Sequence, residues 1–464
     1  MADERTGGGW IERAYHRLQQ AGAPLAPEPS SLLVVPHCAH IDTVHTPDDR
    51  HLILTGWAEN IEAATLSLHD ESDHSKAVQI DPVVIPRDDV RQHLNALGRP
   101  VATNRHGFVA TIPAPEAAKV RLRLVRGGRA MWSAEFPLEP HRVSLREALA
   151  LSLKAAEQSG TGTARNFERL VRAFVPDDPP PPAVVDVRRF GPPIAAGAAL
   201  RVSIVVPFYG DGFYLLDHLT AQGRAPADVE WVFVCDDPAL APSLTDAVVR
   251  RQSALRQPTS LVYLQENGGF AHANNIGAAE SRGEYLLLMN SDIHCRDFAF
   301  VDDAVDVLRG DPSVGCVGFS LRFEDDTIQH DGMTFARAEW YDGLWLSDHP
   351  GKGLRPDPAA PARDSVEAVT AALMLLPRRS LENGRVFDPG YLYGDFEDGD
   401  LCLRLRRQGK TIALLRKDGL YHLERQSVRR LADTDGRRAI TLLNCLRFNA
   451  RWRETLAGGW GVRS

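Results

Sequence analysis

Two patterns of apolar and polar residues divide this chain. Between residues 31 and 138, segments such as HLILTGWAE and KVRLRLVRGG alternate apolar and polar positions, which is typical of strands with one buried face. Beyond residue 199, runs such as RVSIVVPFY and EYLLLMNSD are short and mostly apolar, and helix-like segments separate them. Strands that are apolar on both faces are typical of buried parallel sheets. The pattern predicts a small β-sandwich followed by an α/β domain.

A helical and proline-rich segment joins these two regions. Apolar residues recur at helical spacing in LREALALSLKAAE and ARNFERLVRAFV, whereas PDDPPPPAVVDVRRFGPPIAAGA has too many prolines for a helix or a central strand. The predicted organisation is an N-terminal helical segment (1–30), a β-sandwich-like accessory domain (31–140), a helical segment and Pro-rich linker (141–199), an α/β domain (200–430) and a basic helical extension (431–464).

Composition places the chain among globular proteins. Of its 464 residues, 44% are hydrophobic and 25% charged, and the formal net charge is -8. From Arg404 to the end, however, 15 Lys and Arg stand against 5 Asp and Glu. This basic end is compatible with an anionic partner or with solvated helix faces. We expect no nucleic-acid partner.

Cysteine usage and the apolar stretches bear on the compartment. The 6 cysteines include no CxxC pair, which argues against a zinc ribbon or a disulfide framework and fits a reducing compartment. The N-terminal residues have no apolar core of signal-peptide length, and the longest apolar stretch, 368–377, is too short to cross a bilayer. We expect a cytoplasmic protein, with peripheral association at the cytoplasmic face of the membrane.

Polar residues follow the predicted strands of the α/β domain, where open α/β sheets bind their ligands. The first strand ends in the loop PFYGDG, and the second ends in two carboxylates that can accept hydrogen bonds from a base or a ribose. A glycine turn in ENGGFAHANNIG precedes a helix whose free amide groups can face an anion. The strand YLLLMNSD ends in Asp292, which is either a simple cap or a ligand that a divalent cation bridges to a diphosphate.

A dense acidic cluster lies in YLYGDFEDGDLCLRLRRQG. Asp395, Glu397, Asp398 and Asp400 occur within six positions, and a helix with Leu401 and Leu405 on its buried face follows. Such a cluster is either a capping turn whose carboxylates complement the helix dipole or a site that binds or deprotonates a ligand. Its neighbouring charges should raise the affinity of the group for protons.

The order of seven segments resembles the family 2 glycosyltransferases, which have the GT-A fold, a Rossmann-like, mostly parallel mixed sheet. These enzymes transfer sugars from nucleotide diphosphate donors, and the likeness covers about residues 200–428. The seven segments are VSIVVPFYG, NGGFAHANNIG, NSD, DDTIQHDGM, VTAALMLLPR, FEDGDLCLRLR and LYHLERQS.

The resemblance implies a role for each site residue. Asp398, with Glu397 beside it, corresponds to the catalytic base, and Asp395 to an acceptor-binding residue. Asp292 and His422 would bind Mg²⁺ or Mn²⁺, while His294 is left out of the metal set. The donor-binding set is Pro207, Tyr209, Asp236, Asp237, Asn267, Gly269, Asn275, Asn290 and Ser291.

Two departures from the family pattern leave questions open. Asn290 replaces the first Asp of the common Asp-x-Asp motif, and CDDP replaces the usual DNGS or DDGS, so either Asp236 or Asp237 could contact the nucleotide. Loop 337–364 contains Gly and Pro residues that suit a lid over the site.

The main hypothesis is therefore a bacterial, metal-dependent inverting glycosyltransferase of cell-surface polysaccharide synthesis. It would use a UDP-, dTDP- or GDP-sugar as donor and a glycan or lipid-linked hydroxyl as acceptor. The alternatives are a catalytically silent GT-A-like protein that binds sugars or acts as a scaffold, and a retaining transferase or nucleotidyltransferase on a related frame.

Overall fold

The computed structural model describes residues 38–70, 77–116, 119–194, 199–210, 212, 214–339, 341–423 and 434–459. All elements below lie within one compact unit, Ala39–Ser464. The helical segment predicted for residues 1–30 lies outside the described residues.

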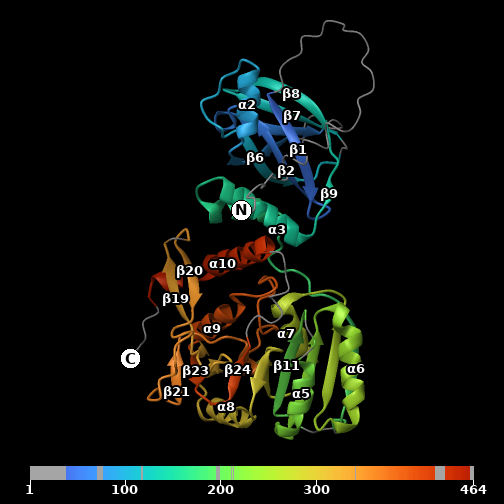
Figure 1. Cartoon of the computed structure of the whole chain (residues 1–464), viewed down its shortest axis with the longest axis vertical. Coiled ribbons are helices and arrows are strands. Elements are labelled where there is room, and N and C mark those ends of the chain that lie inside the picture. Colours follow the sequence, from blue (N-terminus) through green and yellow to red (C-terminus); the bar gives the residue numbers. More distant parts are fainter. Residues whose placement is uncertain are drawn as a thin grey trace, which may run out of the picture. The chain divides into compact units, whose positions relative to one another are not determined.

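Two sheets make up the predicted β domain (Figure 1), in the orders β5-β6-β2-β1-β9 and β4-β3-β7-β8. The alternation seen in the sequence is realised: in β7, Val120, Leu122 and Leu124 are buried. The strands are β1 (Ala39–Thr46), β2 (His51–Ala58), β3 (Thr65–Asp70), β4 (Ala77–Ile80), β5 (Val83–Ile85), β6 (Gly107–Pro113), β7 (Lys119–Arg126), β8 (Arg129–Pro137) and β9 (His141–Arg142).

One helix of this domain was not predicted. Helix α2 (Asp88–Ala96) packs Val90 and Leu94 against Trp57. Asp89 lies in its first turn and accepts a hydrogen bond from Arg87 Nε at 2.8 Å.

The linker segment contains the two predicted helices, α3 (Leu145–Gln158) and α4 (Thr163–Val171). Ser144 and Glu147 cap α3 with reciprocal hydrogen bonds. The prediction of a linker up to residue 199 is wrong for β10 (Val184–Phe190), which is the edge strand of the large sheet and pairs with β13. The prolines lie outside these seven residues, and an edge strand needs partners on one side only.

A nine-stranded mixed sheet supports the α/β domain, in the order β10-β13-β12-β11-β14-β22-β16-β23-β21. Strands β13, β12, β11 and β14 run parallel, and β22 is antiparallel to β14 and β16. This confirms the predicted α/β class with a mixed sheet. The remaining strands are β11 (Val202–Phe208), β12 (Val229–Cys235), β13 (Thr259–Leu264), β14 (Tyr285–Met289), β16 (Val314–Phe319), β21 (Arg363–Val366), β22 (Leu373–Pro377) and β23 (Thr411–Leu415).

Helices cover both faces of this sheet. Ile204 of β11 packs in one core cluster with residues of α5 (Leu215–Ala221), α6 (Ala241–Arg251) and α8 (Ala299–Gly310). The next residue, Val205, packs in another cluster with residues of α7 (Gly269–Glu280) and α9 (Glu397–Arg407). The predicted buried face of α9, Leu401 and Leu405, belongs to this second cluster.

Smaller elements complete the domain around the strand ends. A four-stranded sheet has the order β15-β24-β17-β18, and β19, which ends at the start of the predicted lid region 337–364, pairs with β20 inside that region. The strands are β15 (Ile293–Cys295), β17 (Leu321–Arg322), β18 (Ile328–His330), β19 (Thr334–Ala338), β20 (Leu344–Asp348) and β24 (Leu420–His422). The short 3-10 turns are η1 (Ile61–Ala63), η2 (Gln222–Arg224), η3 (Pro238–Leu240), η4 (Gln252–Ala254) and η5 (Arg378–Ser380).

The C-terminal extension is a helix, α10 (Thr434–Ala457), as predicted. Its residues Phe448 and Trp452 are buried in a cluster that includes residues of α3 and α4. Within the described ranges, none of the helices is long and apolar enough to span a membrane. All six cysteines lie in the described ranges, and none of them forms a disulfide bond.

We predict that Gly277→Ala destabilises the fold, because helix α7 lies directly against the sheet at this position. A Cβ atom there would collide with Val205 Cγ1 and come within 3.0 Å of Val234 Cγ2. Overpacking of this kind costs about 1–3 kcal/mol, which exceeds the helix-propensity gain of alanine. Urea unfolding measures the loss. Gly310→Ala at the end of α8 is the control, since a Cβ there meets nothing within 4 Å; equal effects of both changes would contradict the argument.

Candidate active site

A cavity of about 760 Å³ opens at the carboxyl ends of β11, β12 and β14. It brings together residues that are up to 295 positions apart in the chain, from Arg146 to Thr441. The predicted site residues that line it are Pro207, Tyr209, Asp236, Asn267, Gly269, Asn290, Ser291, Asp292, Asp395, Glu397, Asp398 and His422. The strand ends and the acidic cluster therefore share one cavity.

Asp236 joins the end of β12 to the start of α7. Its carboxylate accepts hydrogen bonds from the backbone N–H of Gly268 at 2.7 Å and of Gly269 at 3.0 Å. Burial raises the pKa of Asp236 to about 7. Asn267 Oδ1 also accepts from the Gly269 N–H, at 2.8 Å. These contacts shape the turn that the sequence marked with two glycines.

Asp237 has a structural position. Its side chain caps η3 by accepting from the Ala239 N–H at 3.0 Å, and it accepts from the Gly210 N–H at 3.3 Å. Because Asp236 lines the cavity and Asp237 does not, Asp236 is the better placed of the two for a bound nucleotide.

Asn275 also lies away from the cavity, contrary to the donor-binding position expected for it. Its Oδ1 accepts from the backbone N–H of Val386 at 2.8 Å and of Phe387 at 2.9 Å, and its Nδ2 donates to the Phe387 carbonyl at 2.9 Å. An amide that makes three such hydrogen bonds fixes the approach of residues 386–387 to helix α7.

The candidate metal ligands meet through a short strand pair. Strands β15 and β24 place Ile293 opposite His422, which brings His422 Nε2 to 3.3 Å from Asp292 Oδ1. Two adjacent ligands of an octahedral Mg²⁺ lie about 2.9 Å apart, so this spacing fits a shared cation. His294, on the same strand, is exposed.

Neighbouring groups are consistent with a cation at this point. Asn290 Oδ1 and His422 Nδ1 are buried without a hydrogen-bond partner among the described residues. Within the described ranges, no group of three or more His, Cys, Asp or Glu side chains could hold a metal ion by itself. Two protein ligands leave most of the coordination sphere to a ligand such as a diphosphate.

Glu397, which is buried, and Asp398, which is half-buried at the cavity, open helix α9. Asp398 Oδ1 accepts from the Gly399 N–H at 2.7 Å, and Oδ2 accepts from the Ala371 N–H at 3.3 Å. Burial raises the pKa of Asp398. The pKa of Glu397 lies well above its usual value, first because of burial and then because of the charges of Asp398 and Asp395. The expected upward shift is present, but burial is its main cause.

The loop before α9 has an unusual backbone. Tyr393, Asp395 and Phe396 have φ values of 57°, 85° and 73°, which residues other than glycine rarely adopt. Asn444 of α10 holds this loop: its Oδ1 accepts from the Leu392 N–H at 3.0 Å, and its Nδ2 donates to the carbonyls of Leu392 at 2.9 Å and of Gly394 at 2.7 Å. Strained backbone persists only where surrounding contacts hold it.

Helix α10 also binds the acidic cluster directly. Arg437 Nη2 lies 3.0 Å from both carboxylate oxygens of Asp395, and the Thr441 hydroxyl donates to Asp395 Oδ2 at 2.7 Å. Asp395 is thus paired within the protein, although it lines the cavity predicted to bind the acceptor.

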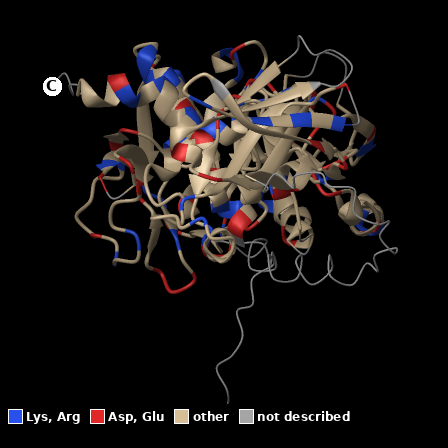
Figure 2. Cartoon of the chain, turned by 90° about the horizontal axis from the view of Figure 1, so that it is seen from above, with Lys and Arg blue, Asp and Glu red and all other residues tan. Residues whose placement is uncertain are grey.

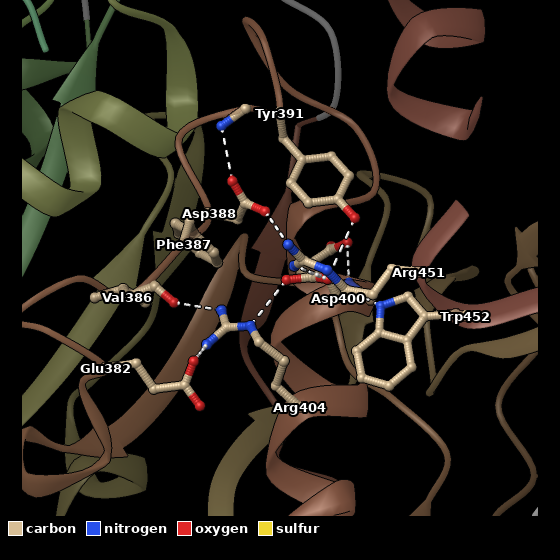
Figure 3. Close-up of polar contacts among 12 residues, drawn as sticks. Glu382, Val386, Phe387, Asp388, Tyr391, Asp400, Arg404, Arg451 and Trp452 are labelled. Carbon is tan, nitrogen blue, oxygen red and sulfur yellow. Dashed lines mark hydrogen bonds and ion pairs between the residues drawn. The ribbon is translucent and has the colours of Figure 1, made fainter. Parts of the chain in front are cut away.

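A buried ion-pair network anchors the first turns of α9 (Figure 3). Asp400 is fully buried and accepts from Arg451 Nη1 at 2.7 Å, Trp452 Nε1 at 2.9 Å and Arg404 Nε at 2.9 Å. Arg451 also binds Asp388, at 2.5 Å. Since Arg451 and Trp452 belong to α10, the network fastens α10 to the helix that carries Asp398.

These pairs also account for part of the basic C-terminus. Arg437, Arg447 and Arg451 of α10 pair with Asp395 and Asp388. Over the described chain, basic and acidic residues are interspersed (Figure 2). Charge in this helix thus serves internal contacts at these three positions.

Further cavity residues escaped the sequence analysis because they come from segments outside the strand-end motifs. Arg146 comes from α3 and Ile440 from α10, while His349 and Lys352 lie within the predicted lid region 337–364. The additional lining residues are Arg146, Phe270, Gln329, Met333, Leu346, Ser347, His349, Lys352, Thr370, Ala371, Ala372, Tyr393, Gly394, Phe396, Arg437, Ile440 and Thr441. The helical spacing of α3 and the basic character of the C-terminus were visible, but nothing in either pointed to this cavity.

The fold and the cavity define the class of this domain: an α/β domain with a ligand cavity at the carboxyl ends of its strands. Residues 203–355 match the model of the family described as Glycosyl transferase family 2. This match confirms the resemblance to that family over residues 203–355, and the segments VTAALMLLPR, FEDGDLCLRLR and LYHLERQS lie beyond it.

Two curated relatives match parts of the chain. It is 30% identical over 187 residues to the uncharacterized protein y4gI of Sinorhizobium fredii, which covers 40% of this chain and 20% of that protein. It is 30% identical over 240 residues to the O-antigen biosynthesis protein RfbC of Myxococcus xanthus, which covers 49% of this chain and 18% of that protein. The chain thus matches about a fifth of the length of these relatives.

Two solved structures are also similar in part. GalNAc-T7 with UDP, GalNAc and Mn²⁺ has a TM-score of 0.37 and 14% identity, covering 49% of this chain and 44% of that one. The mannosyltransferase PcManGT from Pyrobaculum calidifontis, in complex with GDP-Man and Mn²⁺, has a TM-score of 0.34 and 17% identity, covering 68% of this chain and 88% of that one.

We predict that Asp400→Asn strongly destabilises the protein, because it leaves the charges of Arg404 and Arg451 without their buried partner. Breaking a buried ion pair from one side costs about 3–5 kcal/mol in the free energy of unfolding. Denaturant unfolding measures this loss.

The matched control is Glu382→Gln, which removes the other carboxylate that binds Arg404. Glu382 is 43% exposed in that pair, so its loss should cost less than about 1 kcal/mol. If the two substitutions cost the same, the network does not anchor α9 as described.

Proposed function

We propose that this chain is a metal-dependent inverting glycosyltransferase that transfers a sugar from a nucleotide diphosphate donor to an acceptor hydroxyl. The observation that carries the proposal is that Asp398 and Asp292 line one cavity. An in-line displacement needs a base on one side of the anomeric carbon and charge stabilisation for the leaving diphosphate on the other.

The residues at the strand ends bind the donor. Asp236 and Asn267 organise the turn before α7, whose first residues, Gly269 and Phe270, line the cavity. The loop from Pro207 to Tyr209 forms the neighbouring wall. This arrangement suits a nucleoside next to Asp236, with its diphosphate directed toward Asp292.

Asp292 and His422 are the residues that would hold Mg²⁺ or Mn²⁺. When bound, such a cation would neutralise negative charge that develops on the diphosphate as the glycosidic bond breaks. A carboxylate and an imidazole together are more compatible with Mn²⁺ than with Mg²⁺.

Asp398 acts as the base of the transfer. Its carboxylate takes the proton of the acceptor hydroxyl while that oxygen forms a bond to the anomeric carbon. The bond between this carbon and the diphosphate oxygen breaks, and the nucleotide diphosphate leaves with the bonding electrons. Attack from the side opposite to the leaving group inverts the anomeric configuration. Partial burial, which raises the pKa of Asp398, makes it a stronger base than an exposed aspartate.

The biological setting is also a proposal. Part of the chain is similar to an O-antigen biosynthesis protein, which supports a glycan or lipid-linked acceptor in cell-surface polysaccharide synthesis. We propose a cytoplasmic location with peripheral attachment to the membrane. Flotation with lipid vesicles tests the attachment, and recovery of all protein in the unbound fraction would refute it.

We predict that Asp398→Asn lowers kcat by about 10²–10⁴-fold, because general-base catalysis contributes a factor of this size. The assay follows release of nucleotide from UDP-, dTDP- and GDP-sugars with Mn²⁺.

In the unsubstituted protein, kcat should fall as the pH drops through the raised pKa of Asp398, since protonation removes the base. Nucleotide binding should persist in the variant. Unchanged turnover by Asp398→Asn would exclude this residue as the base. A sugar product that retains the anomeric configuration of the donor would exclude inversion.

We predict that Asp292→Ala and His422→Ala each reduce the Mn²⁺-dependent stabilisation of the protein by a nucleotide diphosphate. A ligand that binds only the folded state raises its melting temperature, so loss of a metal ligand reduces the rise. Thermal unfolding with UDP or GDP, with and without Mn²⁺, measures the effect. His294→Ala is the matched control, because His294 is exposed on the strand that follows Asp292. A metal response that survives both substitutions would place the cation elsewhere.

A further inference from the structure

The segment DDTIQHDGM contains a histidine that has no role in the proposed mechanism. His330 ends β18 and is fully buried. Its Nδ1 lies 3.0 Å from Nδ1 of His349, the residue after β20, and the two rings meet edge to face at 70°. His349 lines the cavity, so the pair connects the buried core to the active-site wall.

One backbone contact determines where the protons of this pair lie. The N–H of Thr370 donates to His330 Nε2 at 3.2 Å. A backbone amide can only donate, so Nε2 carries no proton and the proton of a neutral His330 is on Nδ1. Nδ1 then donates to Nδ1 of His349, which must also be unprotonated. The proton of His349 is therefore on Nε2.

The surroundings keep His330 neutral. Burial, followed by the nearby His349, His422 and Lys352, lowers the pKa of His330 well below its usual value. His349 in turn cannot take a proton at Nδ1 without losing the hydrogen bond from His330. The pair thus forms a hydrogen-bond chain with one direction: His330 Nδ1–H donates to His349, and His349 Nε2–H is the last donor. An additional proton on the pair would break this chain.

The same residues support the base. Thr370, whose backbone orients His330, also has its side chain close enough to Asp398 to lower the pKa of that carboxyl. The following N–H, from Ala371, donates to Asp398 Oδ2 at 3.3 Å. His349 and Asp398 are close enough to interact electrostatically, and both line the cavity. Residues 370–371 therefore hold the histidine pair and the carboxylate in one arrangement.

We propose that His349 is an acceptor-binding residue and His330 its positioning residue. His330 holds His349 in the tautomer with Nε2–H, and this group donates a hydrogen bond to a hydroxyl of the acceptor next to the one that Asp398 deprotonates. An acceptor with two neighbouring hydroxyls, a sugar rather than a simple alcohol, uses both groups. This inference rests on the proposed glycosyltransferase function.

The tautomers are tested by NMR of the intact protein labelled with ¹⁵N-histidine. The expected spectrum at neutral pH shows His330 protonated on Nδ1 and His349 on Nε2. In His330→Leu, the spectrum of His349 should change to a mixture of tautomers. The matched control is His106→Leu, which removes another fully buried histidine, one bonded to Asn60 N–H and the Thr103 carbonyl in the β domain. Protonation of His349 on Nδ1 in the unsubstituted protein would overturn the assignment.

The acceptor contact is tested by kinetics with methyl hexopyranosides as probe acceptors and butanol as the comparison. The protein is assayed with a methyl hexopyranoside that it accepts. His349→Phe should raise the KM for this acceptor about tenfold, because one hydrogen bond is lost, and should leave the KM for the donor unchanged. His349→Gln, which retains an N–H donor, should recover most of this loss. Equal KM values for the Phe and Gln variants, or a preference for butanol over every saccharide, would overturn the proposal.

These outcomes separate the inference from the function on which it rests. If the unsubstituted protein consumes no nucleotide sugar, the proposed glycosyltransferase function is refuted, and the acceptor role of His349 is refuted with it. The NMR experiment then decides only the tautomers of His330 and His349. If it transfers sugar and both His349 variants keep the original KM, the function stands and the acceptor contact is refuted.

Discussion

The attachment of helix α10 to helix α9 is the constraint on which the site depends. Asp400 is buried with no access to water, and it accepts hydrogen bonds from Arg404 on its own helix and from Arg451 and Trp452 on α10. A buried carboxylate without such partners would be strongly unfavourable. The geometry that satisfies Asp400 therefore also fixes where α9 begins, and with it the position of Asp398.

The same helix stabilises a loop that would otherwise relax. Asp395 and Phe396 have a left-handed backbone, and the amide of Asn444 and the guanidinium of Arg437 hold this loop from α10. As a result, the buried Glu397 and the half-buried Asp398 stay in place although their charges repel each other and burial raises the pKa of each. A carboxylate held in this way is a stronger base than the same group in water, which suits the proposed proton transfer.

Much of the fold and part of the site could be predicted from the sequence. Apolar runs such as those of β11 and β14 are visible because burial on both faces excludes polar residues. The polar residues after them lie in the cavity because parallel strands end at the same edge. The failures have physical causes as well. Strand β10 was hidden among prolines, and Asn275 was assigned to the ligand because an asparagine that fixes a loop looks the same in sequence as one that binds a donor.

The sequence by itself determined the α/β class and several strands of each domain, since these follow from local periodicity, and the candidates Asp292, Asp398 and His422 came from short motifs that resemble those of a known family. Only the tertiary structure decided which side chains share a space. The 3.3 Å approach of His422 to Asp292, the choice of Asp236 over Asp237, and the entry of Arg146, His349 and Arg437 into the cavity depend on contacts between segments far apart in the chain. Such contacts are selected by packing and by the pairing of buried charges, and neither leaves a periodic signal in the sequence.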